Sequence, residues 1–376
     1  MKKLIQVIHD LSAGGAETLV KDYSLLINKE KFEVKVICFY RRNSSYETLL
    51  DDNDIKVIYL SDYIKTDRTK SPFHNLIFTI KMFFKFKKIL KEENPDIMHT
   101  HLPINTLIKF ARPSKSITIF HTVHNEPTIL WRKNSLIRRI DFIDTKWLVK
   151  HNNMRFIVLH DKMRIEINKL FNVDNSIILN NGIDFSRFDR KKIRDRNEFR
   201  KELKIPKEAF VIGHVGRFTE QKNHEMLVDI FDEIHKKNVK AFLLMIGTGD
   251  LREKIEEKLK KKGLEKFYLI LSNRSDIPDL LNIFDYFVFP SKFEGLPVTL
   301  IEAQKMELPC FISDKISNYS IISNLVTVLP INISSKQWAT AIIDYKYPDK
   351  LILNSEEWDM KNVIKKLEKI YLEEID

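Results

Sequence analysis

The stretch FDYFVFPSKFEGLPVTLIEAQ, residues 284–304, decides the fold class of this chain. Its first part, FDYFVFP, is a short apolar run that predicts a buried strand of a parallel sheet ending at Pro290. A loop with Glu294 and Gly295 follows, and Pro297 predicts the start of a helix, where proline is well tolerated. Strand, loop and helix in this order are typical of an open α/β sheet, which binds ligands at the carboxyl ends of its strands.

Two glutamates mark this edge: Glu294 lies in the loop and Glu302 lies further along, inside the predicted helix. The free N–H groups and the partial positive charge of a helix start favour a phosphate, which carboxylates repel. The carboxylates can instead accept hydrogen bonds from neutral hydroxyls on either side of that phosphate. This combination indicates a nucleotide sugar, in which a diphosphate joins two hydroxyl-rich groups. The alternative is a pair of solvated glutamates, because acidic residues are common in first helical turns.

Strands alternate with helices along most of the chain, which predicts doubly wound parallel sheets. Apolar runs such as LIQVIHD, FEVKVICFY and DIMHTH in the first half, and FVIGHVG, AFLLMIG and FYLILS in the second, are the expected strands. The charged stretch DRKKIRDRNEFRKELK between the halves predicts a linker and the first helix of a second unit. The last segment, SEEWDMKNVIKKLEKIYLEEI, has the apolar spacing of an amphipathic helix.

The composition is that of a soluble globular protein large enough for two domains, with 376 residues and 43% hydrophobic residues. No apolar run reaches the ~18 to 20 residues of a membrane-spanning helix. The net charge of +11 permits nucleic acid, an anionic membrane or an anionic substrate as partner. Because no nucleic-acid-binding motif accompanies the charge, nucleic acid is not expected. Cys38 and Cys310 lie in apolar runs, which predicts buried thiols and a reducing cytoplasm.

A second loop with the chemistry of an anion site is GRFTEQKNHE, residues 216–225, after the run FVIGHVG. Arg217 and Lys222 in this loop can hold a diphosphate and stabilise it as a leaving group. The alternative is a pair of ordinary surface cations, since the chain has 63 lysines and arginines. The predicted position at the same sheet edge as Glu294 favours the site.

Two short motifs also have simple structural alternatives. Gly14 and Gly15, after the first expected strand, either let backbone N–H groups approach a bound phosphate or sugar or form a tight turn. Asp52 and Asp54 match a D-x-D pattern that holds a metal–diphosphate in another class of sugar transferases. Their position between a helix end and a strand predicts a turn instead.

Four histidines follow or occupy expected strands: His99 and His101 in MHTH, and His121 and His124 in FHTVHN. Alternating histidines can ligate zinc, but neither a neighbouring cysteine nor an H-E-x-x-H pattern supports a metal, and none is predicted. A histidine at the end of a strand is a suitable polar contact for a reacting sugar. A structural, hydrogen-bonded role is the alternative for His99, His101 and His121.

Together these motifs resemble the retaining glycosyltransferases of family 4, which have the GT-B fold. GGAE, NNGID, GRFTEQKN, the GTG loop, NRSDIPDLL and PSKFEGLPVTLIEAQ carry the resemblance from residue 14 to about residue 312. GGAET and EGLPVTLIEAQ are most similar to enzymes of bacterial capsule, exopolysaccharide or lipopolysaccharide assembly. The resemblance implies two Rossmann-like domains facing across a cleft. Residues 1–185 would form the acceptor-side domain, with the helix of about 356–376 crossing back to it, and residues 186–355 would bind the nucleotide sugar.

The resemblance also implies roles for the residues that match family motifs. Glu294 would hold hydroxyls of the donor sugar, Glu302 would bind the ribose, and Arg217 and Lys222 would clamp the diphosphate. His124 would lie near the anomeric carbon of the donor, with His121 as the alternative. Further donor contacts, largely through backbone, would come from Gly14, Gly15, Asn273, Arg274, Ile277, Gly295, Leu296 and Pro297.

One position departs from the family pattern. Glu307 stands where the family usually has a glycine, at the end of the predicted helix. This substitution concerns local geometry and not the proposed site.

The expected activity is therefore retaining, metal-independent transfer of a sugar from a UDP- or GDP-sugar to a glycan acceptor, one carried on a lipid, without a cofactor. The alternatives are a nucleotide-sugar epimerase or hydrolase, and a non-catalytic protein that binds glycans or nucleic acid. We expect a cytoplasmic protein that rests peripherally on the inner face of an anionic membrane. Lys81, Lys85 and Lys88, on one face of the expected helix LIFTIKMFFKFKKIL, are the predicted contacts; a solvated basic face is the alternative.

Overall fold

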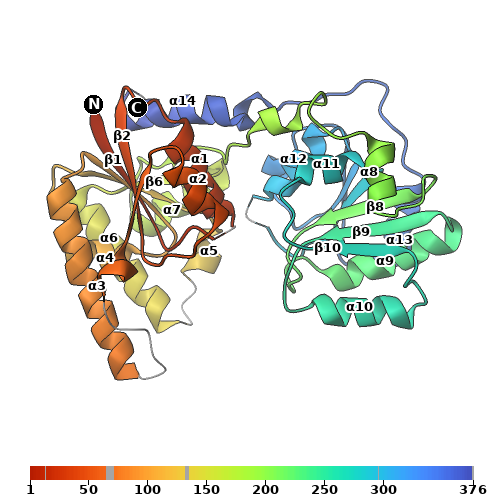
Figure 1. Ribbon diagram of the computed structural model, residues 1–376, viewed down its shortest axis with the longest axis horizontal. Helices are drawn as coiled ribbons and strands as arrows, with labels where there is room; N and C mark the ends of the chain where they lie inside the picture. Colours follow the sequence, from red (N-terminus) through yellow and green to blue (C-terminus); the bar gives the residue numbers. More distant parts are fainter. Residues whose placement is uncertain (13, 65–71, 132–134, 295, 375–376) are drawn as a thin grey trace. The chain divides into compact units, whose positions relative to one another are not determined.

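The computed structural model describes residues 1–12, 14–64, 72–131, 135–294 and 296–374. The chain forms two compact units (Figure 1): Met1–Gly182 with Met360–Asp376, and Ile183–Asp359. Each unit is built around one parallel sheet. The predicted α/β fold with two Rossmann-like domains is therefore confirmed.

The first unit contains a seven-stranded sheet with the order β3-β2-β1-β4-β5-β6-β7. Its strands are β1 (Lys2–Ile8), β2 (Phe32–Cys38), β3 (Lys56–Tyr59), β4 (Ile97–His101), β5 (Thr118–Thr122), β6 (Arg155–Val158) and β7 (Ile177–Ile178). Its helices are α1 (Gly15–Leu26), α2 (Ser45–Asp51), α3 (Pro72–Glu93), α4 (Asn105–Ala111), α5 (Pro127–Leu130), α6 (Leu136–Asn152), α7 (Asp161–Phe171) and α14 (Met360–Tyr371).

The C-terminal helix α14 belongs to this first unit, as the fold-class prediction required. Leu367 and Ile370 of α14 are buried in one cluster with Leu4 of β1 and Phe120 of β5. The buried residues of α14 recur at helical spacing, so one apolar face of the helix covers the sheet while its lysines face outward. The last helix of the chain thus completes the core of the first domain.

The second unit contains a six-stranded sheet with the order β10-β9-β8-β11-β12-β13. Its strands are β8 (Phe210–Val215), β9 (Ala241–Ile246), β10 (Tyr268–Leu271), β11 (Tyr286–Phe289), β12 (Cys310–Ser313) and β13 (Val326–Leu329). Its helices are α8 (Arg196–Glu202), α9 (His224–Lys237), α10 (Arg252–Lys261), α11 (Ile277–Asn282), α12 (Val298–Lys305) and α13 (Ser335–Ile343). Short 3-10 turns lie at Leu60–Tyr63 in the first unit, and at Phe185–Phe188, Asn318–Ser320 and Glu356–Trp358 in the second.

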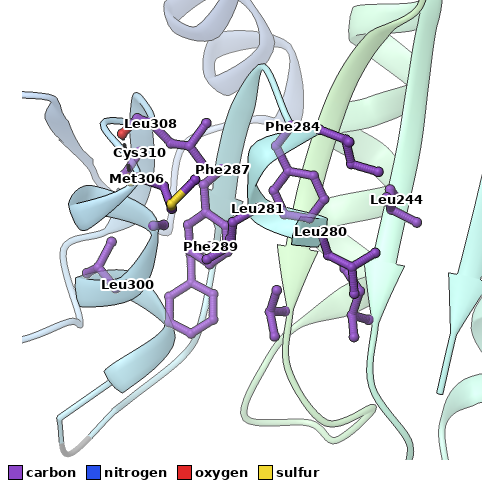
Figure 2. Packing of buried hydrophobic residues seen from close by; sticks show 14 of the residues in the cluster. Leu244, Leu280, Leu281, Phe284, Phe287, Phe289, Leu300, Met306, Leu308 and Cys310 are labelled. Carbon is purple, nitrogen blue, oxygen red and sulfur yellow. Dashed lines mark hydrogen bonds between the residues drawn. The ribbon is translucent and has the colours of Figure 1, made fainter. Parts of the chain in front are cut away.

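Strand β11 shows why the opening stretch of sequence predicts a parallel sheet. Phe287 and Phe289 pack on one face with Leu300 and Met306 (Figure 2), while Val288 joins a separate cluster on the other face. A strand buried on both faces needs apolar residues at every position, which explains the unbroken run. Cys310, on β12, lies in the same cluster as Phe287, and both cysteines of the chain are buried free thiols, as predicted.

Helix α12 begins one residue later than predicted, and a strained residue follows its C-cap. Pro297 is its N-cap rather than its first helical residue, a difference within the usual uncertainty of helix ends. Glu307 follows the C-cap Met306 with φ 60°, in the left-handed region. The family glycine would occupy this conformation without strain, whereas a residue with a Cβ does not. The Glu307 carboxylate accepts a hydrogen bond from Arg190 at 3.0 Å, an exposed contact of small value.

We expect Glu307→Gly to raise the free energy of unfolding by about 0.5 to 1 kcal/mol, because relief of the left-handed strain exceeds the lost surface ion pair. Glu307→Ala is the matched control, since it removes the same ion pair but keeps the Cβ. Urea unfolding of the three proteins measures the difference. Equal stabilities of the glycine and alanine variants would show that the backbone at this position carries no strain.

Candidate functional site

The loops that carry the predicted anion site leave the second sheet at its topological switch point. Strand β8 is followed by β9 and β10 on one side, and β11 lies on its other side. Because the strands are parallel, the loops after β8 and β11 emerge at the same edge. The first loop carries Arg217 and Lys222, and the second carries Glu294. Open α/β sheets bind their ligands at this type of position.

Lys222 and Glu294 form a buried ion pair, which the sequence did not indicate. The Lys222 ammonium donates to Glu294 Oε1 at 2.8 Å, and the two side chains are 15% and 7% exposed. The ammonium also lies 4.5 Å from the centre of the Phe289 ring. Burial lowers the pKa of Lys222, and the neighbouring Glu294 carboxylate opposes this shift. The Glu294 carboxylate therefore helps the buried Lys222 ammonium to remain charged.

Gln221 joins the two loops around this pair. Its side-chain amide donates to Glu294 Oε2 at 3.2 Å, and its carbonyl accepts from the backbone N–H of Lys292 at 2.8 Å. Asn223 adds a hydrogen bond from its amide to the carbonyl of Pro290 at 3.1 Å. These contacts hold the Lys222 and Glu294 side chains in place. Sequence reasoning missed Gln221, although its place beside Lys222 in a polar loop was the available signal.

Arg217 is held differently from Lys222. Its side chain is exposed, and no hydrogen bond or ion pair joins its guanidinium to any part of the chain that the structure describes. Its positive charge contributes to the lowered pKa of Lys222, so the two cations act on the same region. The backbone beneath is fixed by the GTG loop, where a Cβ at Gly247 would lie 2.0 Å from the carbonyl oxygen of Gly216. Arg217 is thus the cation free to meet an incoming anion.

The start of α12 completes this edge. The N-cap Pro297 makes no side-chain hydrogen bond to the helix, and no side chain in the described part of the chain caps the backbone N–H groups of its first turn. Leu296 is half-buried and Pro297 is buried immediately before the helix. The predicted contact Gly295 lies outside the described residues. Uncapped N–H groups at the same sheet edge as Arg217 and Lys222 make an arrangement that suits a phosphate.

Glu302, in α12, is buried and unusually basic. It is 9% exposed, and burial raises its pKa to about 7, while Arg187 counteracts part of this shift. Arg187 also donates to the carbonyl of Ser275 at 2.9 Å, which ties the 3-10 turn Phe185–Phe188 to the segment before α11. Sequence reasoning did not single out Arg187. Because burial disfavours the charged form of Glu302, hydrogen bonds from a ligand to this carboxylate would stabilise that form.

The segment predicted to frame a base, residues 273–277, offers a ligand mainly its backbone groups. Asn273 is exposed with φ 53°, and Ile277 is the first residue of α11. The Arg274 side chain is committed to Asp276, to which its Nε donates at 2.7 Å. This pair raises the pKa of Arg274 and lowers that of Asp276. Arg274 therefore shapes the turn, and its side chain is less available to a ligand than its backbone.

The first unit also places predicted residues at a switch point, here between β1 and β4. Gly14 is the N-cap of α1 with φ −146°, a conformation open to any residue, and Gly15 begins the helix. A Cβ at Gly15 would meet nothing within 4 Å, and one at Gly14 would meet only the flexible end of Glu17. The turn itself therefore does not require either glycine, so the tight-turn alternative loses its physical basis.

Two of the four histidines are hydrogen-bonded to threonines, and the other two lie close to each other. His99 and His121 are buried and hydrogen-bonded, His99 to Thr122 at 2.6 Å and His121 to Thr100 at 2.8 Å, which fits the structural alternative. His101 is also buried, and its Nδ1 lies 3.1 Å from Nε2 of His124. His124 follows β5 and is half-buried, and burial lowers its pKa to about 4.

The geometry gives no support to a metal ligand set. Within the described ranges, no group of three or more His, Cys, Asp or Glu side chains is arranged to hold a metal ion. Asp52 is the C-cap of α2, and Asp54 has φ 59° in the turn before β3, so their predicted role in a turn is confirmed.

Two family profiles match the chain. The profile described as Glycosyltransferase Family 4 matches residues 13–187, and that described as Glycosyl transferases group 1 matches residues 195–352. The UDP-Gal:alpha-D-GlcNAc-diphosphoundecaprenol alpha-1,3-galactosyltransferase of Escherichia coli is 28% identical over 324 residues, 84% of this chain and 79% of that protein. The capsular polysaccharide biosynthesis glycosyltransferase CapH of Staphylococcus aureus is 26% identical over 394 residues, 99% of each chain.

A solved structure has the same fold over its full length. The crystal structure of Anabaena Alr3699/HepE in complex with UDP-glucose superposes with a TM-score of 0.74 at 16% identity, and the match covers 100% of both chains. At this identity the likeness concerns the fold.

Proposed function

The chain belongs to glycosyltransferase family 4, and from this premise we propose that it transfers a sugar from a UDP- or GDP-sugar to a glycan acceptor carried on a lipid. Glycosyl transfer in polysaccharide synthesis is supported by the two family profiles together with the capsular and diphosphoundecaprenol-dependent relatives. The name of the Escherichia coli relative, which gives UDP-Gal as donor and a diphosphoundecaprenol-linked acceptor, favours a nucleotide-sugar donor and a lipid-linked acceptor. The same fold with bound UDP-glucose in the Anabaena protein is compatible with this donor.

One observation carries the proposal: Arg217, Lys222 and the uncapped start of α12 converge on the switch point of the second sheet. When the anomeric C–O bond breaks, its electron pair passes to the diphosphate. Fixed cations and N–H groups aimed at this developing charge stabilise it without reorganisation. In our proposal they do so in place of a metal ion. The acceptor hydroxyl attacks from the face that the diphosphate leaves, and its proton passes to a phosphate oxygen, so the anomeric configuration is retained.

In this proposal the two carboxylates contact the two hydroxyl-rich groups on either side of the diphosphate. Glu302 accepts hydrogen bonds from the ribose, because its buried carboxylate is the one that lacks a strong counter-charge. Glu294 receives hydroxyls of the transferred sugar while its other contacts, to Lys222 and Gln221, keep it oriented. Asn273 to Ile277 frame the base through the backbone. For the first unit we propose the roles that the resemblance implies, with His124 as a contact of the sugar and the Gly14–Gly15 backbone as a contact of the phosphates.

Thermal-shift measurements with a panel of UDP- and GDP-sugars test donor binding, since a ligand at 100 times its Kd stabilises a protein by about 2.7 kcal/mol. Sugar release with and without a lipid-linked acceptor then separates the candidate activities. A transferase releases the nucleotide much faster when the acceptor is present, whereas an epimerase or hydrolase turns over the donor without it. Binding without any turnover would instead mark a non-catalytic protein.

We further propose that the first unit rests on an anionic membrane. No helix in the described part of the chain is both long and apolar enough to span a bilayer. Lys81 and Lys88 are exposed on α3. The Lys88 ammonium lies 3.6 Å from the Glu92 carboxylate. The Lys85 ammonium lies 3.5 Å from the centre of the Tyr63 ring. These contacts leave the basic face less free than the sequence suggested.

Apolar side chains on the same layer of helices support the membrane proposal. Helices α3, α4 and α6 pack side by side on the first unit (Figure 1). Phe84 of α3 is 70% exposed, and α6 carries a stripe of apolar side chains that are 42% to 78% exposed: Leu136, Ile137, Ile140 and Ile143. Exposed apolar residues beside cations are typical of surfaces that enter the lipid interface.

Replacing Lys81, Lys85 and Lys88 by glutamate should release the protein from acidic vesicles and make residual binding insensitive to salt, because each cation contributes about 1 kcal/mol near such a surface. Co-sedimentation at two salt concentrations measures this effect. Ile137→Ser with Ile140→Ser is the matched variant, which should weaken binding without changing its salt dependence. A triple lysine variant that still co-sediments fully would show that α3 is a solvated face.

A further inference from the structure

A chain of buried hydrogen bonds runs from the C-terminal helix to His124. The amide of Gln6, in β1, donates to the hydroxyl of Tyr371, in α14, at 3.2 Å. The Oε1 atom of the same amide lies 2.9 Å from Nε2 of His101, in β4. Nδ1 of His101 lies 3.1 Å from Nε2 of His124. Gln6 and His101 are fully buried, so water does not take the place of any of these partners.

We infer that Tyr371, Gln6 and His101 act as positioning residues that hold His124 in the tautomer with its proton on Nε2, so that Nδ1 presents a lone pair to a hydroxyl of the donor sugar. The part of this inference that concerns the sugar rests on the proposed function; the tautomer itself does not. Nδ1 of His124 has no hydrogen bond to the described residues, and the ring is half-buried.

The tautomer follows from the direction of each bond. Because the NH2 group of Gln6 faces Tyr371, its Oε1 is left as an acceptor, and Nε2 of His101 must carry a proton. A neutral His101 then has a lone pair on Nδ1, which accepts from Nε2–H of His124. A neutral His124 with its proton on Nε2 has its lone pair on Nδ1. Burial lowers the pKa of both rings, which keeps them neutral near pH 7.

A second branch from Tyr371 agrees with this direction. The Tyr371 hydroxyl lies 2.5 Å from Nδ1 of His99, and Nε2 of His99 lies 2.6 Å from the hydroxyl of Thr122. If Tyr371 donates its proton to His99, its oxygen is left to accept from Gln6, as observed. Turning the Gln6 amide would reverse both branches and place the proton of His124 on Nδ1. The orientation of one buried amide therefore selects the tautomer of His124, the histidine that follows β5.

Nitrogen-15 NMR of labelled histidines tests the tautomer directly, because a ring nitrogen with a lone pair resonates far from one that carries a proton. In the native protein we expect the lone-pair signal at Nδ1 of His124 and the protonated signal at Nε2. Gln6→Leu removes the link and should give His124 a mixture of both tautomers. Gln6→Glu keeps an acceptor for His101 and should restore the native pattern.

The matched control is Thr100→Val, which removes the partner of His121 on the same strand as His101 but lies outside the relay. It should leave the His124 signals unchanged. In transfer assays, Gln6→Leu and Tyr371→Phe should lower kcat roughly tenfold, the scale of one lost hydrogen bond, with the donor KM within about twofold of native.

A native His124 with its proton on Nδ1, or a Gln6→Leu variant with unchanged His124 signals, would overturn the inference. The outcome is separable from the proposed function. If the tautomer pattern is as expected but His124→Ala transfers sugar normally, the relay stands and the assigned contact of His124 with the sugar fails.

Discussion

Replacing Arg217 by alanine should lower kcat by roughly 100- to 1,000-fold, the scale for losing one preorganised group that stabilises transition-state charge. The free energy of unfolding should change by less than about 0.5 kcal/mol, because the exposed guanidinium has no hydrogen bond or ion pair within the described chain. Steady-state kinetics and urea unfolding measure the two effects. Near-normal turnover would remove Arg217 from the mechanism.

Lys222→Ala should cause a similar loss of kcat but should also destabilise the protein, by about 3 to 5 kcal/mol. The reason is the buried pair: without Lys222, the Glu294 carboxylate is left buried beside Gln221 and lacks its counter-charge. The expectation from sequence alone, that Arg217 and Lys222 clamp the diphosphate alike, does not distinguish these variants. Lys222→Met combined with Glu294→Gln is the control, and should recover much of the stability but none of the activity. Equal stability of the Arg217 and Lys222 variants would show that the pair is not a structural element.

The second large effect concerns Glu302. Glu302→Gln should weaken binding of the free nucleoside diphosphate roughly 10- to 100-fold, the scale of hydrogen bonds to a charged group. Native binding should weaken as the pH falls below about 7, because protonation then removes the carboxylate that accepts the ribose hydroxyls. The variant should bind with an affinity that is independent of pH in this range. Calorimetry at pH 6 and pH 8 measures the affinities of the native protein and of the variant for the nucleoside diphosphate and for the intact donor.

The raised pKa of Glu302 predicts that stability depends on pH in the opposite direction to ligand binding. Burial raises the pKa of Glu302 from 4.5 to about 7, so the native state binds one more proton than the unfolded state between these values. Its contribution to stability is therefore present at low pH and is lost as the pH rises through 7. Glu302→Gln should raise the Tm at pH 8 and leave it nearly unchanged at pH 4. A Tm gain of equal size at both values would contradict the assigned pKa.

Glu294→Gln provides the contrast. It should leave binding of the nucleoside diphosphate nearly unchanged, because the bound diphosphate supplies the negative charge that Lys222 loses with Glu294. Binding of the intact donor should weaken, because the sugar hydroxyls lose a charged acceptor. Equal losses for both ligands in both glutamate variants would show that the division of roles between Glu294 and Glu302 is wrong.

Local sequence patterns foresee the elements but not the pairs between them. The strand, loop and helix of residues 284–304 were predictable from local patterns. An unbroken apolar run favours a buried parallel strand, and the two prolines favour the end of that strand and the start of a helix. The ion pair of Lys222 and Glu294 was not predictable, since the two residues lie in loops that follow different strands and meet only when β8 and β11 become neighbours. The raised pKa of Glu302 likewise depends on burial, which the sequence of α12 does not show.

The histidines of the first unit illustrate the same limit. Their alternation on β4 was visible, and it suggested either a polar contact with the reacting sugar or structural roles, with no metal predicted. Their hydrogen-bond partners were not visible, because Tyr371 lies on the last helix of the chain and Gln6 on the first strand. The exposed apolar stripe of α6 was also missed, since an apolar periodicity does not reveal whether a face is covered.

The central claim is tested most directly by transfer of a labelled sugar from the donor that the thermal-shift panel selects to a lipid-linked glycan acceptor, in excess chelator, with the configuration of the new linkage read by NMR. The account predicts acceptor-dependent transfer that persists in chelator and retains the anomeric configuration of the donor. Inverted product, or complete loss of transfer that added metal restores, would contradict it.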